Sequence, residues 1–184
     1  MLLVKNAEVY APEYLGKKDL LICGGKIECI QDSIGELPVE CEILDAEGKI
    51  LTPGFLDQHV HITGGGGEGS FHTRTPELQM SELVENGITT VVGLLGTDGI
   101  TRSVDNLYAK TRVLCEEGVS AYMLTGAYGY PSPTLTGEID RDIVFVKEIL
   151  GVKLAISDHR APNVTEDQLI QIASKARVAG MLSG

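Results

Sequence analysis

Residues 51–69 read LTPGFLDQHVHITGGGGEG, and this stretch decides the fold class. A Pro-Gly turn is followed by an apolar segment over residues 54–62 that is predicted to form a strand. His59 and His61 are two positions apart, so their imidazoles point to the same side of that strand, close enough to bind one metal ion. The alternative is two histidines of the core or surface. Their position directly before a glycine loop favours a site.

The glycine loop, Gly64 to Gly69, formally fits the dinucleotide-binding pattern G-x-G-x-x-G. That pattern requires a helix at its last glycine and an acidic residue at the end of the next strand. Here the helix is predicted to begin only at Pro76, and the next strand ends in Leu-Leu-Gly. No Lys-Ser or Lys-Thr pair follows, which excludes a P-loop. We interpret the loop as backbone that lets a ligand approach closely, with Glu68 as its single charge; a flexible solvated loop is the alternative.

Beyond the loop, predicted strands alternate with predicted helices. The expected strands cover residues 88–96, 119–126 and 151–158, and a short helix is expected over 142–150. Two longer helices follow Ser103, ending at Gly118, and the capping box Thr165-x-x-Gln168. A further helix is predicted from Thr75 as cap and Pro76 as first residue to Gly87. The residues expected to face the core from these helices are Met80, Leu83, Val84, Val104, Leu107, Tyr108, Leu114, Cys115, Leu169, Ile170, Ala173 and Ala176.

This alternation predicts parallel βα units with strands buried on both faces, which leaves a doubly wound sheet or a (β/α)8 barrel. Four units between residues 53 and 180 are roughly half of the ~250 residues of a full barrel. Residues 1–52 instead predict a small antiparallel β unit, with a hairpin at Gly24-Gly25. We therefore expect two parts, 1–52 and 53–184.

Lys153 lies in the apolar strand segment GVKLAIS. A buried lysine must be paired, neutral or modified, since desolvating an ammonium costs several kcal/mol. A neutral lysine can react with carbon dioxide to give a carbamate that bridges two metals; an edge-strand lysine with a snorkelling stem is the alternative. Further polar residues follow the other predicted strands, where a barrel places its site: Thr97, Asp98, Tyr128, His159 and Arg160.

Composition narrows the function classes. The chain has 184 residues and a formal net charge of -11, which argues against a dedicated nucleic-acid binder. Its four cysteines show no zinc-site spacing and are interpreted as reduced thiols. The first residues lack the apolar run of a signal peptide, and no segment approaches the roughly 18 apolar residues of a membrane span. A cytoplasmic protein without membrane or nucleic-acid partners is expected.

The stretch at residues 51–69, together with GAYGYP at 126–131 and GVKLAISDHR at 151–160, resembles the binuclear amidohydrolase superfamily and, within it, the isoaspartyl (β-aspartyl) dipeptidases. The resemblance covers all 184 residues. It implies a TIM-type (β/α)8 barrel, of which about the first four βα units are present, preceded by part of a small β-sandwich. The GGGGEG loop separates the dipeptidases from the dihydroorotases and hydantoinases, which share His-x-His and the lysine.

The resemblance also implies a chemistry. His59 and His61 would bind one zinc ion, and Lys153, carboxylated, would bridge it to a second. A hydroxide held between the metals would attack the side-chain amide of a β-aspartyl dipeptide. Tyr128 would donate a hydrogen bond to the developing oxyanion. Glu68 would pair with the α-ammonium of the substrate. Gly66, Thr97 and Arg160 would hold the polar ends of the substrate, Arg160 through a carboxylate.

The superfamily takes two further histidine ligands and a proton-shuttling aspartate from later strands. We therefore expect this chain to be the N-terminal half of a peptidase of roughly twice its length, a homo-oligomer when complete, and inactive as this fragment alone. One rival is another amidohydrolase, such as a dihydroorotase, hydantoinase or N-acyl amino-acid deacylase. The other is a non-catalytic barrel scaffold.

Overall fold

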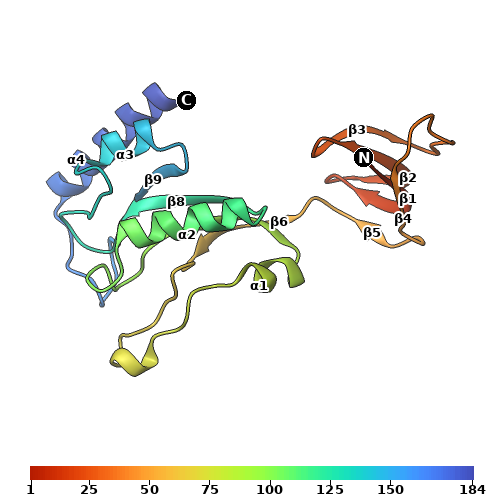
Figure 1. The fold of residues 1–184 in the computed structure, drawn as a ribbon. Coiled ribbons are helices and arrows are strands. Elements are labelled where there is room, and N and C mark those ends of the chain that lie inside the picture. Colours follow the sequence, from red (N-terminus) through yellow and green to blue (C-terminus); the bar gives the residue numbers. More distant parts are fainter. The chain divides into compact units, whose positions relative to one another are not determined.

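The computed structural model describes residues 1–184, which form two compact units, Met1–Gly54 and Phe55–Gly184. The first unit contains one sheet of five strands with the order β3-β2-β1-β4, in which β5 also pairs with β1 (Figure 1). Its strands are β1 (Leu2–Tyr10), β2 (Tyr14–Cys23), β3 (Lys26–Gln31), β4 (Glu42–Asp45) and β5 (Ile50–Leu51). Gly24 and Gly25 join β2 to β3 with φ angles of 57° and 77°, which confirms the predicted two-residue hairpin turn.

The prediction of a purely antiparallel first unit is wrong. Strands β4 and β5 both run parallel to β1, with Glu42 beside Leu2 and Ile50 beside Glu8. The reason is the connection over residues 32–41, which carries the chain from β3 back to the start of β1 before it re-enters the sheet. The unit holds a single sheet, so a sandwich remains a prediction for the whole protein.

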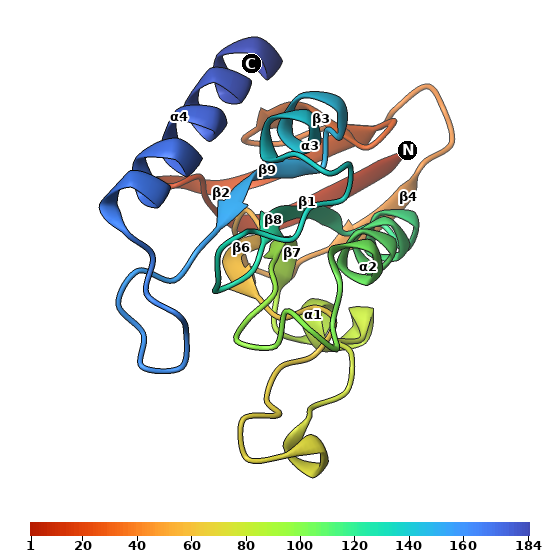
Figure 2. The ribbon, with the colours of Figure 1, turned by 90° about the vertical axis from the view of Figure 1, so that its left-hand side faces the viewer.

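The second unit is built on a parallel sheet whose strand order follows the chain. The strands are β6 (Phe55–Val60), β7 (Ile88–Gly93), β8 (Ser120–Gly126) and β9 (Ile149–Lys153). The helices are α1 (Met80–Glu85), α2 (Val104–Glu116), α3 (Ile139–Phe145) and α4 (Glu166–Ser183), with the short 3-10 helix η1 (Phe71–Thr73) in the long loop after β6. That loop projects away from the sheet, and α3 packs against α4 (Figures 1 and 2). A doubly wound sheet reverses its strand order at a switch point, and these four strands show no reversal.

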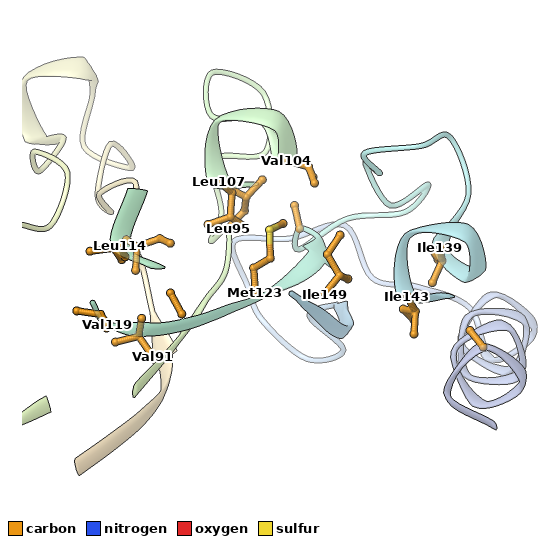
Figure 3. Packing of buried hydrophobic residues seen from close by; sticks show 14 of the residues in the cluster. Val91, Leu95, Val104, Leu107, Leu114, Val119, Met123, Ile139, Ile143 and Ile149 are labelled. Carbon is orange, nitrogen blue, oxygen red and sulfur yellow. The ribbon is translucent and has the colours of Figure 1, made fainter. Parts of the chain in front are cut away.

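One hydrophobic cluster joins the sheet to all four helices (Figure 3). Val91, Met123 and Ile149 occupy the same face of three neighbouring strands. The opposite face is only partly covered: Leu56 and Leu150 are 60% and 54% exposed, whereas Val92 is 8% exposed. Burial on both faces, as predicted, therefore holds for part of the sheet only, since the helices all contribute to a single cluster on one face. The helix residues of that cluster are Leu83, Val104, Leu107, Leu114, Ile139, Ile143, Ile172 and Ala179.

Helix α2 begins with the Ser103 cap as predicted, but α1 begins later than expected. Gln79 caps α1 through a capping box with Glu82. Thr75, the predicted cap, instead accepts a hydrogen bond from the Gly65 N–H on its Oγ1 at 2.7 Å. The tertiary contact of Thr75 with the glycine loop thus replaces the local cap. Val84, expected inside, is 58% exposed.

The other boundary errors lie in the second half. Residues 142–150 were expected to be helical, but α3 ends at Phe145 and β9 begins at Ile149, so that the strand stops at Lys153 rather than at residue 158. A short apolar run carries no period long enough to separate helix from strand. Helix α4 has the predicted capping box at Thr165, yet it buries Ile172 and Ala179 and leaves Ile170 exposed. None of the helices is both long and apolar enough to cross a membrane.

Candidate active site

A cavity of about 50 Å³ lies at the carboxyl ends of the parallel strands, where barrels and parallel sheets build their sites. The loops after β6, β7, β8 and β9 all contribute to it. Seven of the candidate residues named from the sequence line it, while His59 and Lys153 do not. The lining residues are His61, Gly64, Gly65, Gly66, Glu68, Gly96, Thr97, Asp98, Arg102, Tyr128 and Arg160.

The two histidines lie side by side at the end of β6. His59 is in the strand and His61 follows its last residue, and their ring centroids are 5.8 Å apart with the planes nearly perpendicular at 84°. The Nδ1 atom of His61 lies 3.1 Å from the carbonyl oxygen of Leu94. A carbonyl only accepts, so Nδ1 donates and Nε2 is left as a free lone pair, the arrangement that metal-binding histidines use.

Neighbouring residues favour the ligand form of this pair. Partial burial, followed by the positive charges of Lys153 and His61, lowers the pKa of His59, which favours the neutral imidazole that binds metals. Gly96 leaves room for the His61 ring, since a Cβ at this position would lie 2.8 Å from the ring Cε1.

Lys153 is the last residue of β9 and pairs with Gly126 of β8. Gly126 has a φ of 87°, and a Cβ there would lie 2.6 Å from the Lys153 carbonyl, so only glycine fits beside this lysine. The Nζ atom lies 5.3 Å from the centre of the Tyr128 ring. Burial lowers the pKa of Lys153, and its charge is felt by His59. Burial therefore favours the neutral, reactive form of the amine, which lies over the Tyr128 ring.

The donor set fits part of a metal centre. No group of three or more His, Cys, Asp or Glu side chains lies together in the chain, so the candidate ligands are His59, His61 and Lys153. Two neutral imidazoles and a carboxylated lysine would supply the nitrogen and oxygen donors that zinc prefers. Three donors cannot fill two coordination spheres of about four ligands each, so a binuclear centre needs further ligands.

Glu68 and Arg160 both line the cavity and form an ion pair. The Thr97 hydroxyl donates to Glu68 Oε1 at 3.1 Å, and Arg160 Nη1 lies 3.4 Å from the same oxygen. A hydrogen bond from its own backbone N–H, then the Thr97 hydroxyl and the Arg160 charge, lower the pKa of Glu68. The loop thus presents an ionised carboxylate beside a cation, at the places that the sequence assigned to substrate binding.

Arg160 is oriented by Asp158, a residue to which the sequence gave no role. Its Nε and Nη2 atoms donate to the two oxygens of Asp158 at 2.9 and 2.7 Å, and Nη2 also lies 3.4 Å from the Tyr128 hydroxyl. The side-chain and backbone hydrogen bonds from Arg160 hold the pKa of Asp158 well below its usual range. The clamp directs the guanidinium toward Tyr128 and Glu68. His159, between the two, has a side chain that is 90% exposed and stays outside the site.

A second group of charges connects Asp98, which was named from the sequence, with Arg74 and Arg102, which were not. Arg102 is 5% exposed, and its Nη1 lies 3.4 Å from Asp98 Oδ2, which also accepts from Arg74 at 2.8 Å. Burial would raise the pKa of Asp98, but hydrogen bonds from Thr101 and Ile100 and the charge of Arg74 outweigh it and lower the pKa to about 2. The sequence offered one signal for this group, a cluster of polar residues between β7 and the Ser103 cap.

Comparison with known proteins places this geometry among hydrolases. No protein family model matches the chain. The crystal structure of β-aspartyl dipeptidase from Fervidobacterium islandicum AW-1 matches 100% of the chain with a TM-score of 0.94 and 49% identity. The structure of that dipeptidase in complex with β-Asp-Leu gives a TM-score of 0.92 at 49% identity over the same 100%. A dihydroorotase of Listeria monocytogenes serotype 4a (strain HCC23) is 36% identical over 126 residues, 66% of the chain.

The chain spans only part of these proteins, namely 50% and 48% of the dipeptidase in its two structures and 28% of the dihydroorotase. The match to the dipeptidase nevertheless includes every residue of the candidate site. The resemblance predicted from the sequence is thus confirmed: over its whole length this chain is similar to the β-aspartyl dipeptidases of the amidohydrolase superfamily.

Proposed function

We propose that this chain is the N-terminal half of a metal-dependent dipeptidase that hydrolyses β-aspartyl dipeptides. The observation that carries the proposal is the pair of opposite charges, Glu68 and Arg160, 3.4 Å apart on one side of the cavity. A β-aspartyl dipeptide carries a free α-ammonium and two carboxylates, so it can bind both charges at once. The similarity to a dipeptidase at 49% identity supports the same substrate class.

The arrangement disfavours the rival substrate. Dihydroorotate carries a carboxylate and no ammonium, so Glu68 would repel it. Arg160 alone could bind that carboxylate, but Asp158 already neutralises much of its charge. A scaffold without catalysis has no need of a partly buried lysine at the end of β9 or of two adjacent histidines at the end of β6. The residues in hand therefore support a dipeptidase over either alternative.

Each site residue has a proposed role. Glu68 pairs with the α-ammonium, and the Thr97 hydroxyl, already bonded to Glu68, supports it. Arg160 binds a carboxylate of the substrate. Gly66 offers an N–H that no residue of the chain accepts, and its φ of 70° and the Thr73 carbonyl leave no room for a side chain. Tyr128, beside Arg160, donates its hydroxyl to the oxygen of the scissile amide.

His59, His61 and a carboxylated Lys153 would hold zinc ions. A bound zinc ion acts as a Lewis acid and lowers the pKa of a coordinated water to about 7. The residues of this chain would then bind the substrate with its amide carbon facing that end of β6 and β9. We further propose that the four strands are the first half of a closed barrel, and that the whole protein is a cytoplasmic homo-oligomer.

The experiment is the Glu68→Gln variant of the full-length protein, assayed with β-Asp-Leu. A hydrogen bond to a charged partner contributes about 1.5–3 kcal/mol, so the KM should rise roughly 10- to 100-fold. Glu85→Gln, an exposed residue of α1 outside the site, serves as the matched control and should leave KM unchanged. An unchanged KM in the Glu68 variant would contradict the assignment.

A further inference from the structure

Arg102 holds the glycine loop from below. It precedes the Ser103 cap of α2, and its side chain is buried. Its guanidinium donates to carbonyl oxygens at both ends of the loop. The four acceptors are the carbonyls of Thr63 at 3.1 Å, Gly65 at 2.8 Å, Gly66 at 3.4 Å and Thr75 at 3.4 Å. One buried cation therefore joins the outgoing and the returning arm of the loop that carries Glu68.

The loop needs such a fixed centre. Six of the seven residues from 63 to 69 are glycine or threonine, so its own sequence gives little conformational restriction. The two arms also approach closely: a Cβ on Gly64 would lie 2.4 Å from the Thr75 carbonyl, and one on Gly66 would lie 2.4 Å from that of Thr73. Without the guanidinium, the carbonyls of Thr63, Gly66 and Thr75 would lose their donor, and that of Gly65 would keep only Thr75 as a donor.

The same guanidinium reaches the neighbouring strand. Asp98 accepts from Arg102 and Arg74, and it is adjacent in sequence to Thr97, whose hydroxyl bonds to Glu68. The loop after β6 and the loop after β7 therefore share one set of charges. Glu68 is bonded to Thr97, while Arg102 contacts the Gly66 carbonyl, two residues before Glu68, and the Asp98 carboxylate, next to Thr97.

We propose that Arg102 is a positioning residue, which fixes the glycine loop against the loop after β7 so that Glu68 meets the α-ammonium of the substrate. This inference rests on the proposed function and adds a specificity determinant that acts through the loop that carries Glu68. A planar guanidinium with five N–H groups can serve carbonyls on two arms at once. A lysine ammonium is a point charge on a flexible stem and cannot span them.

The test compares Arg102→Lys with Arg112→Lys in the full-length protein. Arg112 lies on α2, is 43% exposed in its side chain and pairs with Glu148, away from the loop. Hydrogen–deuterium exchange should become at least about tenfold faster for the amides of residues 63–75 in Arg102→Lys, with α2 unaffected, and stay at the wild-type rate in Arg112→Lys. If Arg102→Lys does not fold, Asp98→Asn, which removes the carboxylate beside the guanidinium, should accelerate the same amides by a smaller factor.

A second readout separates positioning from general support. Succinyl-leucine is β-Asp-Leu without its α-ammonium. Arg102→Lys should raise the KM of β-Asp-Leu about tenfold, while the inhibition constant of succinyl-leucine changes less than about twofold. Unchanged exchange in the loop, or faster exchange with both ligands weakened equally, would overturn the proposal. Wild-type protein that binds β-Asp-Leu no better than succinyl-leucine would refute the proposed function, whereas the exchange experiment would still decide whether Arg102 fixes the loop.

Discussion

Replacing Gly96 by alanine should remove metal from the site by displacing the imidazole of His61. The new Cβ would lie 2.8 Å from His61 Cε1, and ordinary contact begins at 3.4 Å, so the ring must retreat by about 0.6 Å. Zinc–nitrogen bonds of about 2.0–2.1 Å tolerate deviations of only about 0.2 Å. The required shift is about three times that tolerance, and the hydrogen bond to the Leu94 carbonyl opposes any larger rotation.

The assay is the metal content of purified full-length protein by mass spectrometry, together with its β-Asp-Leu turnover. Gly65→Ala is the matched comparison, because its Cβ would lie 3.6 Å from the same His61 ring, an ordinary contact. We expect Gly96→Ala to lose most of its metal and Gly65→Ala to keep it. Full metal occupancy in Gly96→Ala would show that His61 is not a ligand.

Three further predictions concern other parts of the chain. Lys153→Ala should lose most of the metal, and short carboxylic acids should partly restore it. Lys147→Ala, which changes a side chain that is 85% exposed, should lose none. Equal metal contents in the two variants would refute the carbamate. Asp98→Asn should lower the free energy of unfolding by about 2 kcal/mol at pH 7, because the pKa of the Asp98 carboxyl is about 2 in the folded protein against the usual 3.8. The difference from wild type should vanish as the pH falls from about 4 to about 2. A difference that stays constant with pH in denaturant titrations would contradict this. Residues 1–184 alone should be inactive and self-associate, since one face of the parallel sheet is open; a monomeric fragment with turnover, by sedimentation and assay, would disprove it.

The sequence was most informative where a local pattern had one physical solution. The Gly24-Gly25 hairpin, the Ser103 cap and the Thr165 capping box were predicted correctly, since each depends on a few adjacent residues. The alternation of strands and helices after residue 53 also predicted the parallel order correctly. Local chemistry and strand periodicity together were sufficient for the parallel strand order of the second unit.

The errors arose where distant contacts decide the conformation. Thr75 satisfies the sequence rules for a helix cap, but its hydroxyl instead accepts a hydrogen bond from Gly65, ten residues earlier in the glycine loop. The direction of β4 relative to β1 depends on the path of residues 32–41, which no pattern in those residues specifies.

In the candidate site too, residues with a local sequence signal could be predicted, and residues defined by distant contacts could not. His59, His61 and Lys153 could be proposed as metal ligands from the sequence because histidines at strand spacing and a lysine in an apolar strand are unusual. Asp158 and Arg102 could not, because an orienting carboxylate and a buried arginine look like ordinary surface charges until the loops are folded. Residues that hold the site residues in place are recognised by burial and partners, neither of which is visible in the sequence.

The central claim, that Glu68 and the glycine loop select a β-aspartyl dipeptide, is tested most directly by turnover of the full-length protein with three substrates. β-Asp-Leu, α-Asp-Leu and dihydroorotate should be assayed side by side with the same metal-loaded sample. We predict hydrolysis of β-Asp-Leu and no measurable turnover of the other two. Turnover of dihydroorotate without turnover of β-Asp-Leu would contradict the account.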